Sequence, residues 1–280
     1  MNKPAHMVIG LIVNIALLAA GGTIAAGSAA ASSTLPTLSI AITSSSATVS
    51  GARESGGINI VSSDTGVKEA AVIVFLLKPG VSVAEAEAFS REKKSHDPNS
   101  SSKIGSIVFD TEVNPGQGSE AQTDLQPGQY IVLVGAGEGE AQLRTSFVVS
   151  ASKSPATLPT PQATIRSIEF GFRGPSTLHD GELVRFENEG FLVHMDIGIQ
   201  VKNQKTAKQV VKLLLAGKEK QASKLAIGAI TFAGPVSTGA YQQETITAKP
   251  GIYVEACFMD TQDGRSHTQL GMERIVRITR

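Results

Sequence analysis

The sequence contains an internal repeat. The segment GINIVSSDTGVKEA, which begins at Gly57, aligns without a gap with GELVRFENEGFLVH, which begins at Gly181. Further along, IGSIVFDTEVNPGQG from Ile104 aligns with IGAITFAGPVSTGAY from Ile227, and this alignment continues without a gap through PGQYIVLV and PGIYVEAC. Ordered matches across a whole unit indicate a duplication, so the sequence predicts two domains of the same topology.

Candidate domain boundaries follow from the repeat and from a proline-rich stretch. Residues 151–164, ASKSPATLPTPQAT, are rich in Pro, Ser and Thr and lack apolar periodicity, which is typical of a linker. The predicted domains are therefore residues 32–150 and 165–280, each of about 115 residues and long enough to bury its own core. Between its two repeated segments each domain carries a helical candidate, at residues 82–94 and 206–221.

Composition and turn signals favour β-structure. The chain has no Trp, 3 Tyr and 28 Gly, and it is rich in Val, Ile, Ser and Thr. The repeated PG-x-Y places Pro and Gly in a turn that leads into a strand. Short strands with regularly spaced turn signals are typical of β-sandwiches. We therefore expect an all-β fold of two tandem Greek-key β-sandwich domains, each with a short helix inserted between strands.

Residues 1–31 have the pattern of an export signal. Lys3 precedes an apolar run over residues 7–20, which is interrupted by Gly10 and Asn14, and small residues follow as at a cleavage site. An uncleaved membrane anchor is the alternative, although the run is shorter than the ~20 apolar residues that usually span a bilayer. We expect an exported protein, periplasmic or extracellular, without membrane attachment after signal removal.

Charge and cysteine content limit the partners. The chain carries 25 basic and 25 acidic residues, which argues against nucleic acid or an anionic membrane as partner because both call for a basic protein. The expected partner is a redox protein or another protein, and the oligomeric state stays open. Because Cys257 is the only cysteine, an exported chain can form no intramolecular disulfide, so this thiol is free, metal-bound or paired with another chain.

Cys257 begins a stretch of potential metal ligands, CFMDTQDGRSHTQLGM, which also contains His267 and Met272. Thiolate, imidazole and thioether are ligands that copper prefers. Each residue also has an ordinary explanation, since a lone cysteine packs as a small hydrophobe, Asp263-Gly264 favours a hairpin turn, and a methionine fills a core. The stretch is therefore either part of a metal site or a turn between two strands.

Three segments of the second domain resemble the cupredoxin family of blue, or type 1, copper proteins. VRFENEGFLVH resembles the strand that leads to the family's first copper-binding histidine, PGIYVEAC has its G-x-Y-x-x-x-C spacing, and HTQLGMERIVRIT has its His, four residues, Met and closing strand. The resemblance implies two cupredoxin-like domains and a copper cofactor held in the second by His194, Cys257, His267 and Met272. Two imidazoles, a thiolate and a weak axial thioether form an electron-transfer copper site.

The first domain lacks these ligands. Ala70 occupies the place of His194, and Val134 occupies that of Cys257. The loop after Val134, GAGEGEAQLRTSFVV, supplies neither His nor Met. The resemblance therefore implies a first domain that is structural or binds a partner.

Three features of the second domain depart from the family pattern. Nine residues separate Cys257 from His267, which is more than small cupredoxins usually have. The type 1 site of two-domain copper nitrite reductases resembles this longer spacing, but those enzymes have a histidine beside the cysteine where this chain has Ala256. Glu255 shares a strand face with Cys257 where the family has an apolar residue, so either the strand bulges or this end of the domain is hydrated. Strand alternation places His194 on the more polar face unless a bulge turns it inward.

Two function classes follow from these residues. The first is an exported copper protein that transfers electrons or handles copper through the second domain. The second is a metal-free secreted β-sandwich module that binds a partner protein or a small ligand. The sequence contains no nucleophile elbow, no zinc-protease helix motif and no phosphate-binding glycine loop. With Ala256 in place of a ligand to a second copper, we expect a protein that is not an enzyme.

Overall fold

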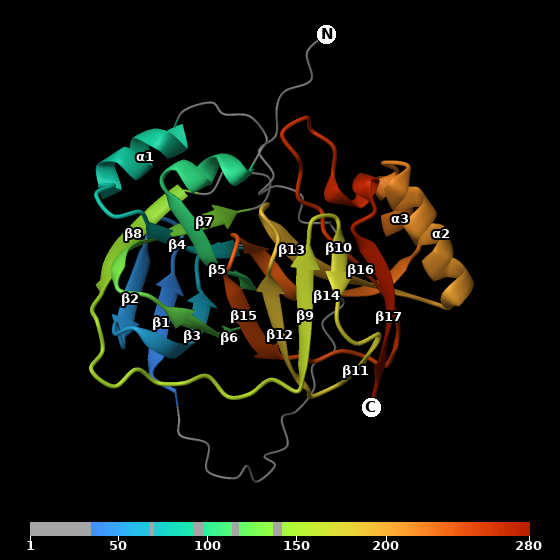
Figure 1. Ribbon diagram of the computed structural model, residues 1–280, viewed down its shortest axis with the longest axis horizontal. Helices are drawn as coiled ribbons and strands as arrows, with labels where there is room; N and C mark the ends of the chain where they lie inside the picture. Colours follow the sequence, from blue (N-terminus) through green and yellow to red (C-terminus); the bar gives the residue numbers. More distant parts are fainter. Residues whose placement is uncertain (1–34, 68–69, 92–97, 114–117, 137–141) are drawn as a thin grey trace.

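The computed structural model describes residues 35–67, 70–91, 98–113, 118–136 and 142–280. Strands form most of the molecule, and the helices lie at its periphery (Figure 1). The all-β sandwich prediction is confirmed. The predicted export signal lies outside the described residues. No helix within the described ranges is both long enough and apolar enough to cross a bilayer.

The N-terminal half consists of strands with one α-helix and one 3-10 helix between them. In chain order these are β1 (Thr37–Ile42), β2 (Ala47–Gly51), β3 (Gly56–Asp64), β4 (Ala70–Leu77), α1 (Val83–Arg91), η1 (Pro98–Lys103), β5 (Gly105–Val113), β6 (Gly118–Leu125), β7 (Gly128–Ala136) and β8 (Gln142–Val149).

The C-terminal half repeats this pattern with additional short elements. They are β9 (Ala163–Ile168), β10 (Gly171–Arg173), β11 (Thr177–His179), β12 (Leu183–Asn188), β13 (His194–Val201), α2 (Gln204–Leu215), α3 (Glu219–Ser223), β14 (Ala226–Val236), β15 (Tyr241–Thr245), β16 (Gly251–Ala256), η2 (His267–Leu270) and β17 (Glu273–Thr279).

One sheet runs through both halves, and each half adds a smaller sheet of its own. The large sheet has the order β10-β9-β12-β15-β6-β3-β1-β2, and the small sheets have the orders β5-β4-β7-β8 and β11-β17-β16-β13-β14. In the small sheets the strands that the repeat aligns occupy the same order, because β4 corresponds to β13 and β7 to β16. The division into domains at residues 151–164 stays a prediction. Strand β9 begins at Ala163, inside that stretch.

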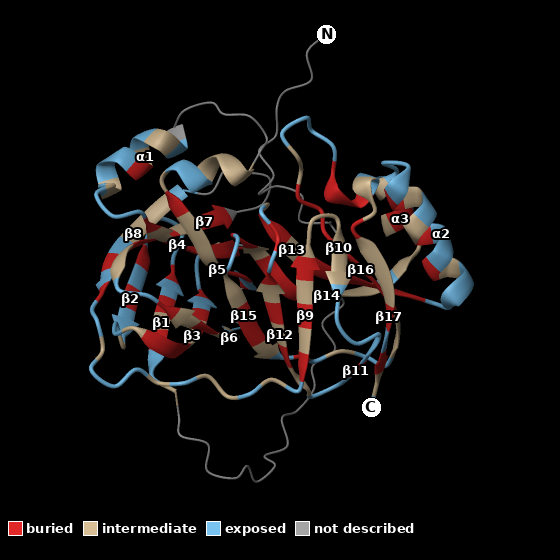
Figure 2. Ribbon diagram, viewed as in Figure 1, coloured by how far each residue is buried: buried red, intermediate tan, exposed pale blue. Residues whose placement is uncertain are grey.

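Each half buries a core between the large sheet and its small sheet (Figure 2). In the C-terminal half Ile165 and Phe186 of the large sheet pack with Tyr253 and Val276 of the small sheet. The opposite face of the small sheet is covered by helix α2. Strands β13 and β16 are therefore buried on both faces, and the polar residues His194, Asp196 and Glu255 are buried with them.

Helix α2 is shorter than the expected residues 206–221. The Asn203 side chain accepts a hydrogen bond from the backbone N–H of Thr206 at 3.0 Å and so caps the start. Gly217, with φ +67°, follows the helix end and turns the chain, and a separate short helix, α3, follows. The first predicted helix, residues 82–94, is observed as α1, and residues 92–94 lie outside the described residues.

The two halves contact each other through strands β5 and β14 and the turn that follows β14. The Ser237 N–H donates to the Ile107 carbonyl at 2.9 Å, and the Ile107 N–H donates to Ser237 Oγ at 2.9 Å. The Gln242 side chain binds both backbone groups of Asp110, at 3.2 and 3.1 Å. These contacts place the β5 edge of the N-terminal half beside the second sandwich.

Candidate metal centre

His194 lies at the first residue of β13 and is fully buried. Alternation groups this side chain with Asp196 and Gln200 on the more polar face of the strand, and both of those residues are buried as well. The pairing of β13 with β14 shifts register between His194 and Asp196 and again between Asp196 and Ile197. In both shifts the extra residues lie in β14, so β13 itself is not bulged and keeps a regular ladder with β16 from Ile197 onward. The face of β13 that carries His194 also carries Gly198, which lies against the core residues Phe232 and Tyr253, so alternation alone turns His194 inward.

Cys257 directly follows β16 and is also fully buried. Its N–H donates to the Met272 carbonyl at 3.2 Å, which ties it to the start of the closing strand. Its sulfur accepts a hydrogen bond from the Met195 N–H at 3.4 Å. Backbone groups from two neighbouring segments therefore hold the thiol in place.

His267 is the first residue of η2 and is fully buried. The turn expected at Asp263-Gly264 exists, with Gly264 at φ +78°. It does not carry His267 into solvent, because the His267 N–H donates to the Met259 carbonyl at 2.8 Å and Ser266 caps η2. The loop returns to the protein interior, and the explanation of the whole stretch as a simple hairpin is wrong.

The three side chains converge on one point. The two Nδ1 atoms of His194 and His267 lie 3.2 Å apart, and Cys257 Sγ lies 3.8 Å from the first and 3.4 Å from the second. Within the described ranges these three residues form the only group of at least three His, Cys, Asp or Glu side chains whose ligand atoms lie this close together.

Met272 is buried in the same apolar cluster as Cys257, together with Val193 and Met259. Its N–H donates to the His267 carbonyl at 3.1 Å. The fourth predicted ligand thus belongs to the wall of the site. Aromatic and aliphatic side chains of both halves complete this wall, including Ile107 of the N-terminal half.

Burial sets the protonation of the ligands. Burial, together with a smaller contribution from the neighbouring His267, lowers the pKa of His194 to about 3. Burial also raises the pKa of the Cys257 thiol to about 12. At neutral pH the metal-free site therefore holds a neutral imidazole at His194 and a protonated thiol, so a metal that binds the sulfur must displace one proton.

The covering of the site involves residues that the sequence did not single out. The Phe170 ring meets the His267 ring edge-on, with 5.3 Å between the ring centres. Asn99 of η1, in the N-terminal half, accepts a hydrogen bond from the Val193 N–H at 2.6 Å. Gly190 lies so close that a Cβ there would sit 2.8 Å from His194 Nε2. No local sequence signal marks Phe170 or Asn99 as neighbours of the site.

Glu255 points into the sandwich interior and is fully buried. A bulge of its strand, or a hydrated end of the domain, was expected at this position. The strand does not bulge, because β16 pairs regularly with β13 and β17 around it, and this end of the domain is polar, with Asp196 and Glu255 both buried there. The Arg274 guanidinium binds the Glu255 carboxylate and also donates to the Gly174 carbonyl at 3.0 Å. Burial raises the pKa of Glu255 and, more strongly, that of Asp196 beside it.

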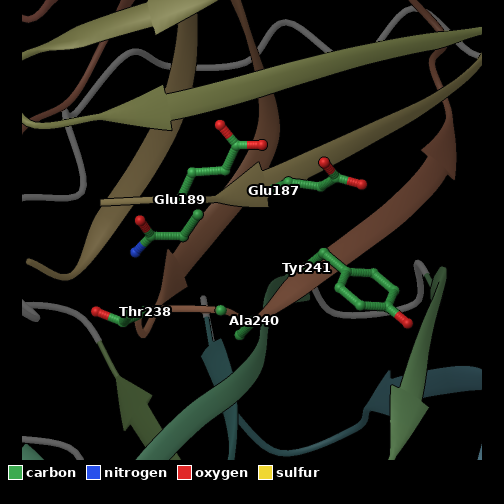
Figure 3. A pocket seen from close by; sticks show the side chains of 7 residues that line it. Glu187, Glu189, Thr238, Ala240 and Tyr241 are labelled. Atoms are coloured by element: carbon green, nitrogen blue, oxygen red, sulfur yellow. The ribbon is translucent and has the colours of Figure 1, made fainter. Parts of the chain in front are cut away.

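The corresponding positions of the N-terminal half are apolar. Ala70 and Val134 are both buried in its core. A surface pocket of about 250 Å³ lies elsewhere, where Glu187 and Glu189 face Thr238 and Tyr241 (Figure 3). None of the four candidate ligands lines it.

Comparisons with known proteins were made at three levels. No family model matches the chain, and no curated protein matches it. Among solved structures, auracyanin B is 17% identical over 44% of this chain and 93% of its own, with a TM-score of 0.28. The reduced auracyanin of Roseiflexus castenholzii is 18% identical over 42% and 95%, with a TM-score of 0.27. A copper-containing nitrite reductase from Thermus scotoductus is 13% identical over 88% and 67%, with a TM-score of 0.25.

These neighbours correct one expectation. From the sequence we expected a protein that is not an enzyme. The similar solved structures include nitrite reductases and multicopper oxidases, which are enzymes, and they contradict that expectation.

Proposed function

We propose that the C-terminal half binds one copper ion through His194 Nδ1, Cys257 Sγ and His267 Nδ1, with Met272 as a weak axial ligand. The observation that carries this proposal is the spacing of the three ligand atoms. Metal–nitrogen bonds of about 2.0–2.1 Å and a metal–sulfur bond of about 2.3 Å put such atoms about 3.3–3.8 Å apart around a shared ion. The measured spacings are 3.2, 3.4 and 3.8 Å.

The donor set favours copper among the common metals. Two imidazoles and a thiolate, near a thioether, combine nitrogen and soft sulfur ligands in the manner of electron-transfer copper sites. Bound copper supplies a one-electron redox couple. The protein residues supply a dry pocket, a His194 that is neutral at physiological pH, and backbone hydrogen bonds that hold the sulfur. The ligand atoms already lie close together, so they need to move little when copper binds. This suits electron transfer or copper handling.

The biological role that we propose is electron transfer or copper handling outside the cytoplasm, with another protein as partner. The export signal that the sequence predicts at residues 1–31 supports the location. N-terminal sequencing of the protein recovered from outside the cytoplasm tests this part. A mature protein that begins at Met1 would contradict signal cleavage.

Copper binding is tested by visible absorption and metal content after addition of one equivalent of Cu(II). The parent protein should bind one copper and absorb strongly in the visible range. Cys257→Ser should abolish this absorption, whereas Met272→Leu should shift it without loss of the metal. His179→Gln is the matched control, because His179 is an exposed histidine of the same half.

Two results would contradict the copper proposal. One is copper binding that Cys257→Ser leaves unchanged, and the other is binding that His179→Gln reduces as much as His194→Gln does. Either result would identify the metal as adventitious. The metal-free binding module would then be the better description.

A further inference from the structure

The surface of α2 and α3 is strongly basic although the whole chain is neutral. Residues 202–224 contain seven lysines, no arginine and a single acidic residue, Glu219. We call these seven side chains the lysine surface. They are Lys202, Lys205, Lys208 and Lys212 on the α2 side, and Lys218, Lys220 and Lys224 around α3.

The lysine surface is not neutralised from within the protein. All seven lysines are exposed. Among the described residues, none of them lies within ion-pairing distance of a carboxylate. Glu219 is half-buried, and the Ser266 side chain hydrogen-bonds to it. The positive charge of this face is therefore available to a partner.

Helix α2 presents its lysines to solvent, and Leu215 at its end is also exposed. Lys205, Lys208 and Lys212 follow a spacing of three and four residues, which places them on one helix face. The opposite face packs onto the small sheet through Ala207, Val210 and Leu214, all buried. Membrane-surface helices bind by inserting an apolar face, and here that face is already covered.

The lysine surface lies beside the candidate copper ligand His267. Figure 1 shows α2 and α3 next to the loop that carries η2. A Cβ at Gly217, which precedes Lys218, would sit 2.7 Å from Gln269 Nε2, and Gln269 belongs to the same turn of 3-10 helix as His267. A molecule held by the lysines would therefore cover the outer side of the loop that delivers His267.

We infer that the lysine surface is the docking surface for a partner protein with a carboxylate-rich face. The inference deepens the proposed function, since such a partner would be the one that exchanges electrons or copper with this site. Lysine acts as a hydrated point charge and is depleted in tight interface cores, whereas arginine is preferred for paired, buried contacts. Seven lysines without an arginine fit fast, charge-steered and short-lived association.

The test uses the metal-free full chain, so that it reports on the lysine surface whether or not copper binds. An oligoglutamate peptide is titrated into the labelled protein at low salt, and amide chemical shifts are followed by NMR. We expect shifts in α2, α3 and η2, and binding that weakens steeply as salt is added. Shifts confined to other parts of the chain would overturn the inference.

A matched pair of triple variants separates location from net charge. The triple variant Lys205→Gln, Lys208→Gln and Lys212→Gln keeps good helix formers on α2 and should weaken peptide binding roughly tenfold at low salt. The control replaces the exposed lysines 78, 103 and 153 of the N-terminal half by Gln and removes the same charge. It should leave binding within about twofold. Equal losses in the two variants would show that only net charge matters and would overturn the inference.

A final arm distinguishes a protein partner from a lipid surface. Vesicles that contain phosphatidylglycerol are compared with the oligoglutamate peptide at the same salt concentration. We expect weaker binding to the vesicles. Stronger binding to the vesicles, lost in the α2 triple variant, would assign the surface to a membrane and overturn the inference of a protein partner. Failure of copper binding alone would leave the peptide result intact.

Discussion

The Nδ1 atoms of His194 and His267 face each other at 3.2 Å inside the protein, from positions 73 residues apart in the chain. At this distance two protonated rings would repel each other, so the folded protein favours a neutral imidazole at His194. Both rings are fully buried, which strengthens this preference.

The first prediction concerns the stability of the metal-free protein at acidic pH. The pKa of His194 is about 3 in the folded protein, against 6.5 for an exposed histidine. The unfolded chain therefore binds the extra proton below pH 6.5. The free energy of unfolding should fall by about 1.4 kcal/mol per pH unit as the pH decreases from about 6.5 toward 3.

Denaturant titrations between about pH 6.5 and pH 5 provide the measurement. His194→Gln should remove most of this slope, whereas His179→Gln should preserve it because His179 is exposed. Buried carboxyls titrate in the same range, so the informative quantity is the difference between parent and variant. Parallel curves for the parent and His194→Gln would count against the depressed pKa.

The second prediction concerns the buried pair of Glu255 and Arg274. Arg274→Leu leaves the Glu255 carboxyl buried without its cation and should lower the free energy of unfolding by about 3–5 kcal/mol. Replacing both residues by apolar ones, as Glu255→Met with Arg274→Leu, should recover much of this loss. Arg277→Leu, at an exposed position of the same strand, is the control and should cost less than about 1 kcal/mol.

Chemical denaturation with a double-mutant cycle measures this coupling. A double variant as unstable as Arg274→Leu alone would show that the pair does not act as a unit. Copper content of the same variants would show whether the pair also positions Cys257, which lies two residues after Glu255.

The third prediction concerns Gly190. A Cβ at this position would lie 2.8 Å from both His194 Nε2 and Glu169 Oε1, so Gly190→Ala must displace the imidazole. Under the proposed function, copper affinity should decrease about 10–100-fold. Competition with a chelator measures the affinity. Gly118→Ala is the control, because its Cβ would come no closer than 3.5 Å to the Ser62 carbonyl oxygen and should leave affinity unchanged.

The fourth prediction tests whether the N-terminal half supports the site. Asn99→Ala removes the acceptor for the Val193 N–H, next to His194, and should reduce copper affinity up to about tenfold. Asn59→Ala, which removes a side chain bound to Glu120 far from the site, should not change it. An equal effect of both variants would indicate general destabilisation, which thermal melts of the metal-free proteins would reveal.

The sequence predicts the fold class well because the signal is carried by local patterns. Strand-forming residues, the repeated PG-x-Y turn and the ordered repeat require no knowledge of tertiary contacts. The end of α2 just before Gly217 is less predictable, since good helix formers, KEKQA, continue past the glycine that stops the helix.

The candidate site can be predicted only in part from the sequence. The identities of the four residues come from the family resemblance. Alternation groups His194 with Asp196 and Gln200, but that this polar face is a buried one depends on the strands that pair with β13 and pack on it. Likewise the burial of Glu255 depends on Arg274, which lies on the neighbouring strand. Both features come from pairing between strands, and single-strand periodicity carries no information about the partner strand.

Strands β6 and β15, which the repeat aligns with each other, also pair with each other in the large sheet. Strands from equivalent positions of the two copies meet edge to edge and antiparallel, with Gln122 opposite Gln243. Self-complementary pairing of this kind is how identical subunits meet across a two-fold axis. Here both partners belong to one polypeptide, so dilution cannot separate them, and neither of these two strand edges is left as a template for aggregation. The half without histidine and cysteine at the candidate ligand positions therefore remains beside the half that carries them.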